Sequence, residues 1–196
     1  MSTVMLVSGG LDSTLMAVLG QEAEVEMNPL FIDYGQINLD REWNACQANF
    51  ARLNLPTPQI ASLGGYGKLL PSGLTDRTRH IVEDAFLPGR NLLFLLVGAG
   101  YAVQRGSSAV SIGLLDERNR LFPDQTRGFL SNAQELLTTA LGKPISVVAP
   151  LMSFSKADVL QAAKERGIDG TYSCHTGNAT PCGTCIACRE YIGLEV

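Results

Sequence analysis

The chain has 196 residues, of which 45% are hydrophobic and 17% are charged, and its formal net charge at neutral pH is −4. This length predicts one domain with at most a small appendage, and the composition is sufficient for a sizeable core. The acidic balance argues against a broad phosphate-neutralising surface, so long nucleic acid is not an expected partner. The short basic segment Asp76–His80 is more simply a solvated loop.

The sequence contains no recognisable export or membrane segment. Its N-terminal residues lack a basic region, and the most apolar stretch, Asn91–Val103, is well short of the roughly 20 residues that span a bilayer. We therefore expect a cytoplasmic protein with no membrane partner, in which this stretch forms a buried helix. The same helix could serve a dimer interface, so a homodimer stays open.

The first half of the chain predicts two strands and two helices. Thr3–Val7 and Asn28–Gly35 are apolar runs typical of buried strands, and Ser13–Leu19 between them predicts a short helix ended by Gly20. A second helix is predicted by apolar residues three or four positions apart, namely Trp43, Cys46, Phe50 and Leu53. This spacing places Cys46 in the core.

The second half continues the alternation after an expected loop, Pro56–Gly89. Ser108–Leu115 and Pro144–Leu151 predict strands, and Ser155 with Asp158 predicts the capped start of a helix that Gly167 closes. The helix between these strands has an apolar face made of Phe129, Ala133, Leu136, Leu137 and Ala140. Alternating strands and helices predict an α/β fold, a Rossmann-like parallel sheet with helices on both faces. Ligands of such sheets bind at the carboxyl ends of the strands.

The segment VSGGLDST, Val7–Thr14, has the features of a phosphate-binding loop. Gly9 and Gly10 let backbone N–H groups approach an anion, and the following helix adds its positive end. Asp12 would repel phosphate unless Mg²⁺ lies between them. Hydroxyl donors are supplied by Ser8, Ser13 and Thr14. A plain turn before a capped helix is the simpler but less favoured interpretation.

Four cysteines lie close together near the C-terminus in a C-x7-C-x2-C-x2-C pattern. They are Cys174, Cys182, Cys185 and Cys188. Four thiolates at this spacing can complete a tetrahedral zinc shell, which predicts a structural rather than a catalytic metal. An iron–sulfur cluster is a weaker alternative, and His175 is not needed as a ligand. We accordingly expect a nucleotide-binding domain over residues 1–170 and a small zinc knot over residues 171–196.

The motif SGGLDS resembles the PP-loop of the ATP pyrophosphatases, enzymes that cleave ATP between its α and β phosphates. FSKAD, Phe154–Asp158, resembles the later lysine motif of that family. The resemblance implies the PP-loop ATPase fold, with ATP as co-substrate. It also implies ATP-binding roles for Val7, Ser8, Gly9, Gly10, Leu11, Asp12, Ser13, Thr14, Asp33, Tyr34 and Lys156.

Further motifs in the same order extend the resemblance to the QueC family over nearly the whole chain. These motifs are DYGQ (residues 33–36), SGLTD (72–76), PGRN (88–91), FPD (122–124) and CGTCIACR (182–189). The family makes 7-cyano-7-deazaguanine, and the resemblance implies an AMP-forming ligase. One ATP would adenylate a 7-deazaguanine carboxylate for attack by ammonia, and a second would convert the amide to a nitrile.

The resemblance also implies residue roles. Asp12, Lys156 and Arg90 would be catalytic, with Mg²⁺ held by Asp12. Substrate binding would fall to Arg90, Asn91, Phe122 and Asp124, with Phe122 stacking on the base and Asp124 accepting from its N–H edge.

The chain departs from the family pattern near the expected substrate site. Ile37 and Asn38 replace the usual Arg-His after DYGQ, and Gln125 and Thr126 replace the usual Cys-Arg after Phe-Pro-Asp. Adenylation is therefore a firmer expectation than the nitrile product. One alternative is an antiphage enzyme that transfers the activated deazaguanine to another amine, such as one on a protein. The others are a tRNA-modifying PP-loop enzyme and a non-catalytic nucleotide-binding protein.

Overall fold

The computed structural model describes residues 2–194, so Met1 and residues 195–196 of the expected zinc knot lie outside the described part. Its centre is a five-stranded, fully parallel sheet in the order β3-β2-β1-β4-β5. The strands are β1 (Ser2–Val7), β2 (Glu26–Asp33), β3 (Gln59–Ser62), β4 (Ala109–Ser111) and β5 (Ser146–Val148). The order reverses between β1 and β4, which is where parallel sheets of this kind bind ligands.

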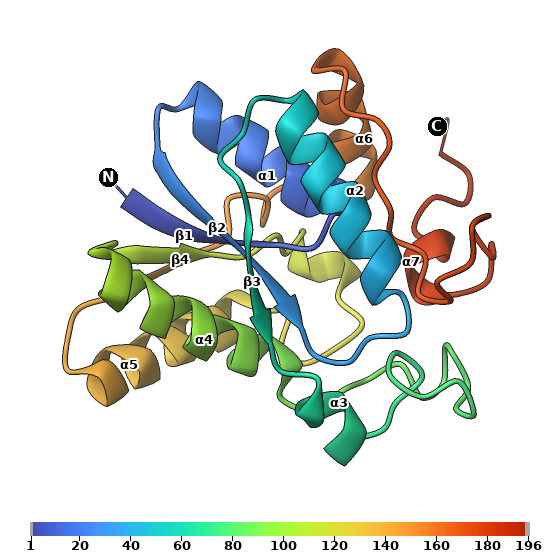
Figure 1. Cartoon of the computed structure of the whole chain (residues 1–196), viewed down its shortest axis with the longest axis horizontal. Helices are drawn as coiled ribbons and strands as arrows, with labels where there is room; N and C mark the ends of the chain where they lie inside the picture. Colours follow the sequence, from blue (N-terminus) through green and yellow to red (C-terminus); the bar gives the residue numbers. More distant parts are fainter. Residues whose placement is uncertain (1, 195–196) are drawn as a thin grey trace.

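Helices cover both faces of the sheet, as the sequence predicts (Figure 1). The helices are α1 (Leu11–Glu22), α2 (Leu39–Arg52), α3 (Gly65–Leu69), α4 (Arg90–Arg105), α5 (Arg127–Leu141), α6 (Lys156–Glu165) and α7 (Ile186–Arg189), with a 3₁₀ turn at Glu117–Asn119. One face carries α1, α2 and α6, and the other carries α4 and α5. The expected capping box between Ser155 and Asp158 begins α6, and Gly167 follows its end in a left-handed conformation.

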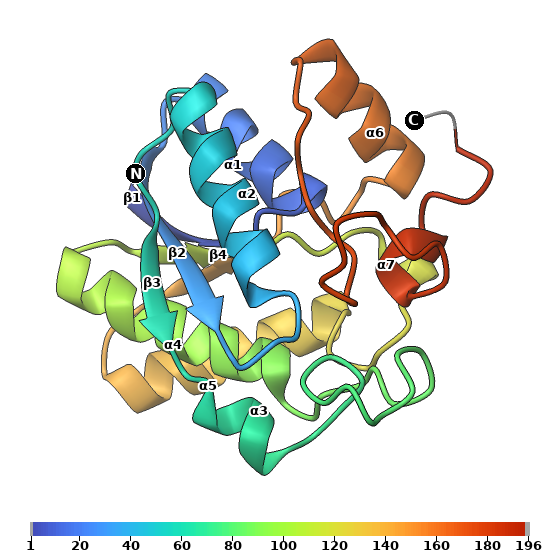
Figure 2. The ribbon, with the colours of Figure 1, turned by 45° about the vertical axis from the view of Figure 1, so that its right-hand side comes forward.

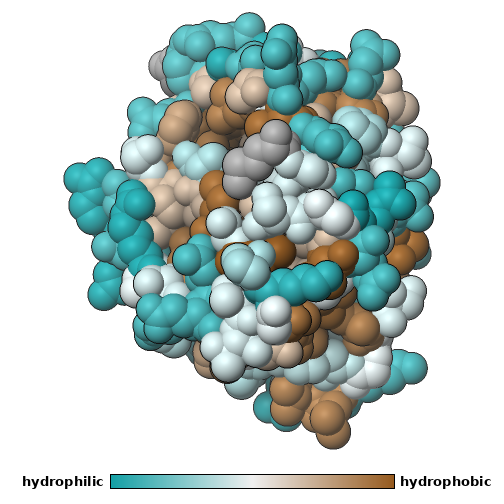
Figure 3. Space-filling view, turned by 90° about the vertical axis from the view of Figure 1, so that its left-hand side faces the viewer, coloured by the Kyte–Doolittle hydropathy of each residue, from teal (hydrophilic) through white to brown (hydrophobic). Residues whose placement is uncertain are grey.

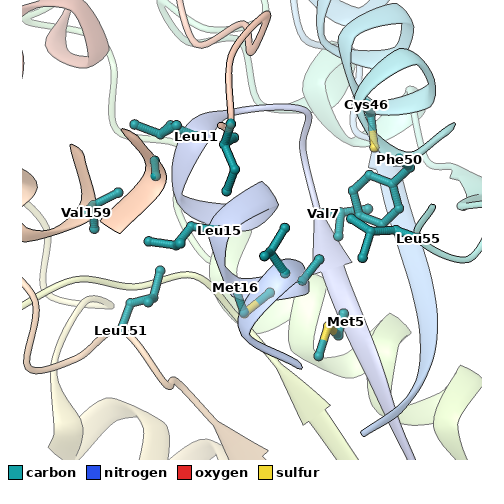
Figure 4. Packing of buried hydrophobic residues seen from close by; sticks show 14 of the residues in the cluster. Met5, Val7, Leu11, Leu15, Met16, Cys46, Phe50, Leu55, Leu151 and Val159 are labelled. Carbon is teal, nitrogen blue, oxygen red and sulfur yellow. The ribbon is translucent and has the colours of Figure 1, made fainter. Parts of the chain in front are cut away.

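In the core on the face of the sheet that carries α1, this helix lies between α6 and α2 (Figure 4). Leu15 of α1 lies near Val159 of α6, while Phe50 of α2 packs toward Val7 of β1. Cys46 is fully buried in this core, as its helical spacing predicts. Burial, reinforced by the nearby Glu42, raises the pKa of the Cys46 thiol to about 12, so it is an inert packing residue.

On the α4 side, two helices bury fewer of their apolar residues than the sequence predicts. The apolar stretch in α4 is buried on one face through Leu95, Ala99 and Ala102, whereas Leu96 is 45% exposed. In α5 the buried positions are Leu130, Ala133 and Leu137, and the predicted Leu136 is 54% exposed. Both helices therefore present one apolar face to a single sheet surface, as expected for helices in an outer layer.

Several element boundaries predicted from sequence are wrong. Helix α1 runs through Gly20 to Glu22, because Gly20 is a packing position at which a Cβ would overlap the terminal methyl of Met5. The expected loop Pro56–Gly89 contains β3 and α3. Strands β4 and β5 are shorter than predicted, since the chain leaves the sheet at Ser111 and Val148.

The surface at the amino ends of β1 and β4 mixes hydrophilic and hydrophobic residues (Figure 3). At the other end, the loop that contains the basic segment Asp76–His80 is largely exposed, and Arg77 donates from Nη1 to the Thr176 carbonyl oxygen at 3.1 Å. Among the described residues, no helix has the length and apolarity needed to cross a membrane.

Two glycines in α4 give a matched test of this packing. A Cβ on Gly98 would lie 2.7 Å from Val110 Cγ2 and 3.1 Å from Leu6 Cδ2, whereas one on Gly100 would meet nothing within 4 Å. We expect Gly98→Ala to lower the free energy of unfolding by about 1–3 kcal/mol through overpacking. Gly100→Ala should raise it by up to about 1 kcal/mol through helix propensity. Urea unfolding of both variants measures the difference, and equal shifts would contradict this packing of α4.

Candidate active site

The loop between β1 and α1 is braced by its own hydroxyl groups. The Ser8 N–H donates to Ser13 Oγ at 3.1 Å, and the Thr14 hydroxyl donates to the Gly10 carbonyl at 2.9 Å. Gly10 is the N-cap of α1 and supplies no side-chain cap, so the first-turn N–H groups are available to an anion. This arrangement is suited to binding phosphate.

The two loop glycines are required by neighbouring protein atoms as well as by the loop conformation. Gly9 has φ +77°, and a Cβ there would overlap the Glu42 carbonyl oxygen and lie 2.8 Å from Cys46 N. Helix α2 therefore packs directly against the loop. From the other side, the Tyr172 N–H donates to the Gly9 carbonyl at 3.0 Å. The absence of a side chain at Gly9 is therefore required by this close packing, a reason that the sequence alone did not give.

Lys156 joins the start of α1 to the C-terminal segment, which is residues 171–194. Its Nζ lies 2.8 Å from Asp12 Oδ1 and 3.0 Å from Glu190 Oε2, and its side chain is 12% exposed. Burial alone would lower the pKa of Lys156, but the carboxylates of Asp12 and Glu190 outweigh it and hold the pKa well above its usual value. The lysine is therefore a fixed positive charge beside the phosphate-binding loop.

Two clefts meet at this lysine. The loop cleft, of about 260 Å³, runs from the phosphate-binding loop past the ends of β1, β2 and β4 to the start of α4. The outer cleft, of about 790 Å³, lies between the segment 113–125 and the C-terminal segment. They share Asp12, Gly113, Leu114, Gln125, Lys156 and Glu190. The two clefts are therefore adjacent at Asp12 and Lys156.

Most of the site residues predicted from sequence line the loop cleft. They are Val7, Ser8, Gly10, Leu11, Asp12, Ser13, Tyr34, Arg90, Asn91 and Lys156. Phe122 lies in the outer cleft, where its ring centroid is 5.2 Å from that of Phe86.

Four predicted residues line neither cleft. Gly9 packs under α2, and Thr14 is fully buried behind the loop. The Asp33 carboxylate accepts from the Gly35 N–H at 2.9 Å in its own turn. Asp124 contributes only its carbonyl oxygen, which accepts from Asn91 Nδ2 at 3.1 Å. The ligand-binding roles of these four residues stay predictions, and none of the four belongs to the lining of either cleft.

Arg90 begins α4 and faces the loop cleft. The preceding Gly89 has φ +73°, and the guanidinium carbon lies 5.8 Å from the ring centroids of both Tyr34 and Phe94. Burial raises the pKa of Tyr34 to about 12, so its hydroxyl stays protonated. The site thus places a cation held over aromatic rings opposite the phosphate-binding loop.

Several polar residues that line the loop cleft were missed by the sequence analysis, among them Glu42 and His175. Burial raises the pKa of Glu42 to about 7, although hydrogen bonds from Gln36 and Asn38 and the nearby Arg90 oppose that rise. His175 Nδ1 is buried with no hydrogen-bond partner among the described residues. Burial and Arg90 together lower the pKa of His175 to about 4. One signal existed for Glu42, because it lies four positions before Cys46 on the apolar face of α2, where a carboxylate is unexpected.

The four cysteines converge as predicted. Their Sγ atoms all lie within 4.8 Å of one another, and Cys182 Sγ is 3.9 Å from Cys188 Sγ. Tetrahedral coordination with Zn–S bonds of about 2.3 Å would place the sulfurs about 3.8 Å apart. The group therefore fits a single ion, whereas the thiolates of a cubane bind separate irons and are spread more widely.

The cysteine segment, residues 172–190, also contributes to the lining of the loop cleft. Its ribbon, which includes α7, lies below α6 in Figure 2. Asn38 Nδ2 donates to the Cys174 carbonyl oxygen at 3.1 Å, and a Cβ on Gly10 would lie 3.0 Å from Ser173 Oγ. Residues on both sides of the expected boundary at 170/171 thus build one site. The boundary itself stays a prediction, but the two parts are in direct contact.

Comparisons with known proteins agree with this arrangement. The family described as "Queuosine biosynthesis protein QueC" matches residues 2–191. The chain is 31% identical to 7-cyano-7-deazaguanine synthase of Campylobacter concisus (strain 13826), covering 95% of this chain and 90% of that one. It is 33% identical to the synthase of the same name from Campylobacter curvus (strain 525.92), covering 95% and 89%.

A solved structure of lower similarity shares the fold. It is the U34-tRNA thiolase NcsA from Methanococcus maripaludis with its [4Fe-4S] cluster, at a TM-score of 0.53 and 14% identity. The match covers 96% of this chain and 62% of that chain. This likeness supports the PP-loop ATPase fold.

Removing one cysteine should release the metal. Cys185 is fully buried, and its N–H donates to Cys182 Sγ at 3.3 Å. We expect Cys185→Ser to reduce bound metal from about one equivalent to near zero and to lower the melting temperature, because metal binding stabilises the folded segment. Elemental analysis with a melting curve measures both quantities. Unchanged metal content and melting would contradict the assignment.

Glu42 should make stability depend on pH. Its pKa rises from 4.5 to about 7 on folding, so the native state binds this proton more tightly than the unfolded state. The resulting stabilisation is present at low pH and is lost as the pH rises toward and through 7. Between about pH 5 and pH 8, the wild type should lose up to roughly 3 kcal/mol of unfolding free energy relative to Glu42→Gln. Parallel pH dependences in urea unfolding would show that Glu42 is not perturbed.

Proposed function

The chain belongs to the QueC family, and from that membership we propose that it is an ATP-dependent synthase acting on a 7-deazaguanine carboxylate. Its reaction would adenylate 7-carboxy-7-deazaguanine and use ammonia to form the amide and then 7-cyano-7-deazaguanine. The observation that carries the proposal is the meeting of two clefts beside Asp12 and Lys156, directly after a phosphate-binding loop. Activation of a carboxylate by ATP needs such a meeting point.

The first step supplies the leaving group that a carboxylate lacks. A carboxylate oxygen attacks the α-phosphorus of ATP, the bond to the β-phosphate breaks, and pyrophosphate departs with the electron pair. The N–H groups at the start of α1 and the Lys156 ammonium would stabilise the charge on that pyrophosphate. Ammonia then attacks the acyl adenylate and displaces AMP to give the amide.

The nitrile requires the same chemistry a second time. The amide oxygen attacks the α-phosphorus of a second ATP, and pyrophosphate leaves again. Loss of both protons from nitrogen and departure of AMP from carbon produce the C≡N bond. Both activations use one phosphate-binding loop, so a single ATP site is sufficient if AMP and pyrophosphate leave between turnovers.

Two metals complete the proposal. Asp12 would hold Mg²⁺ together with the ATP phosphates, since one carboxylate plus phosphate oxygens is a usual donor set for that ion. Mg²⁺ would supply charge neutralisation for the leaving pyrophosphate. The four cysteines would hold a structural zinc, because they form a closed thiolate set with no open position. Its role would be to hold the segment that supplies Ser173, His175 and Glu190 to the clefts.

The identity of the amine acceptor is the part of the proposed reaction that the site residues constrain least. The family departures at Asn38 and Gln125 have structural partners here: Asn38 binds Glu42 and the Cys174 carbonyl, and Gln125 accepts from the Leu121 and Phe122 N–H groups. These changes brace the walls of the clefts. Mass spectrometry of the product from ATP, 7-carboxy-7-deazaguanine and ammonia tests the proposal, because a nitrile supports it and an adenylate without transfer to ammonia indicates another amine as acceptor.

Replacing Asp12 should stop adenylation without unfolding the protein. Loss of its carboxylate removes the Mg²⁺ ligand, and terms of this kind are worth roughly 3 kcal/mol, or about a hundredfold in rate. Asp12→Ala should therefore reduce pyrophosphate release by at least about a hundredfold. Lys156→Ala should be milder if the lysine only supplements the metal. Pyrophosphate release from ATP and 7-carboxy-7-deazaguanine is the measurement.

Lys164→Ala, at an exposed position of the same helix as Lys156, is the matched control and should retain wild-type release. Asp12→Ala should keep its cysteine-bound metal, since Glu190 still balances the charge of Lys156. Near-normal release by a folded Asp12→Ala protein would remove the phosphate-binding loop from the reaction.

A further inference from the structure

The loop cleft contains a carboxylate that the adenylation steps do not use. Glu42 Oε1 accepts from Asn38 Nδ2 at 3.0 Å, and Oε2 accepts from Gln36 Nε2 at 3.3 Å. Both amides are themselves fixed, because Gln36 Oε1 accepts from the Tyr34 N–H and Asn38 also donates to the Cys174 carbonyl. The carboxylate is therefore held in one orientation, and each oxygen keeps a further lone pair for a ligand.

The protein leaves this carboxylate without a cationic partner. Within residues 2–194, no lysine, arginine or histidine forms an ion pair with Glu42. A second polar group in the same cleft, His175 Nδ1, is buried and lacks a hydrogen-bond partner among the described residues. A buried polar atom without a partner is costly, so His175 Nδ1 indicates that a polar ligand completes the cleft. Glu42 lines the same cleft with lone pairs that its two amide partners leave free.

We propose that Glu42 binds the N–H edge of a guanine-type base, accepting from the ring N1–H and from the 2-amino group. This inference rests on the proposed function, which makes a 7-deazaguanine the substrate. Above its pKa of about 7 the Glu42 carboxylate is ionised and only accepts hydrogen bonds, so it then matches an edge with two adjacent donors. The corresponding edge of adenine has one donor and one acceptor, and its ring nitrogen would face a carboxylate oxygen with mutual repulsion.

The opposite end of the substrate also has a partner in the loop cleft. A guanine-type base with a carboxylate at position 7 has its donors at one end and its negative charge at the other. Glu42 and Arg90 both line the cleft and match these two ends. Asp124, the base-reading carboxylate expected from sequence, lines neither cleft, so Glu42 takes its place as the specificity-determining residue.

The test compares two substrates on metal-loaded, full-length protein. The first is 7-carboxy-7-deazaguanine and the second is the analogue without the 2-amino group. Calorimetric binding of each base and pyrophosphate release with ATP are measured for the wild type, for Glu42→Gln and for Glu135→Gln. Glu135 is an exposed carboxylate on α5, so its variant controls for the loss of a charge elsewhere.

We expect the wild type and Glu135→Gln to prefer the 2-amino compound by about tenfold to a hundredfold. Glu42→Gln should reduce this preference by at least about tenfold, because its amide presents a donor where an acceptor is needed. A purely structural role would lower activity toward both compounds equally and leave their ratio unchanged. An unchanged ratio in folded Glu42→Gln would overturn the proposal, and so would an effect confined to the KM for ATP.

Two further measurements cover the cases in which the variant or the reaction fails. If circular dichroism shows that Glu42→Gln does not fold, calorimetry of the wild type is used instead. Equal binding of the two bases by the wild type would refute a carboxylate that recognises the 2-amino group. If the wild type releases no pyrophosphate with either base, the proposed function fails. Calorimetry without turnover then still decides the inference, since a 2-amino preference that Glu42→Gln reduces supports it, and no preference overturns it.

Discussion

A buried ammonium group must have its charge balanced, and this constraint organises the site. Lys156 lies 2.8 Å from Asp12 and 3.0 Å from Glu190, and its Nζ is 4.7 Å from the centre of the Tyr191 ring. These partners come from the first turn of α1 and from the C-terminal segment. One side chain at the start of α6 therefore holds together three parts of the chain that are remote in sequence.

The phosphate-binding loop is fixed from its other side by backbone contacts. Helix α2 approaches so closely that Gly9 has no room for a Cβ, and the Tyr172 N–H binds the Gly9 carbonyl. The loop thus lies between a helix and the cysteine segment, with little freedom to move away from either. Pre-organisation of this kind matters because N–H groups that are already oriented cost no reorganisation when charge develops on a phosphate.

The parts of the fold that depend on local pattern could be predicted from the sequence. β1 and β2 are apolar runs, the capping box of α6 is a four-residue signal, and the cysteines have metal-ligand spacing. β3 could not be predicted, because it is a four-residue edge strand with mostly exposed side chains. Its identity depends on pairing with β2 rather than on its own composition.

In the site, too, residues within local motifs could be predicted from the sequence, whereas contacts between distant parts of the chain could not. Asp12 and Lys156 were each predicted from a motif, but their pairing across 144 residues was not. Asp33 ends β2, where a ligand-binding carboxylate is expected, yet it accepts from the N–H of Gly35 in its own turn. Glu42 and Glu190 are ordinary acidic residues by composition, and only the folded chain brings them to the clefts.

The placement of the cysteines makes thiol reactivity a direct gauge of metal loading. Cys46 is fully buried and its thiol has a pKa of about 12, so a thiolate-seeking reagent should leave it unmodified in the folded protein. All the other cysteines of the chain belong to the metal group. Alkylation of the native protein would therefore measure the fraction of empty metal sites. A folded, metal-free molecule would offer four thiols, whereas an unfolded molecule would offer all five.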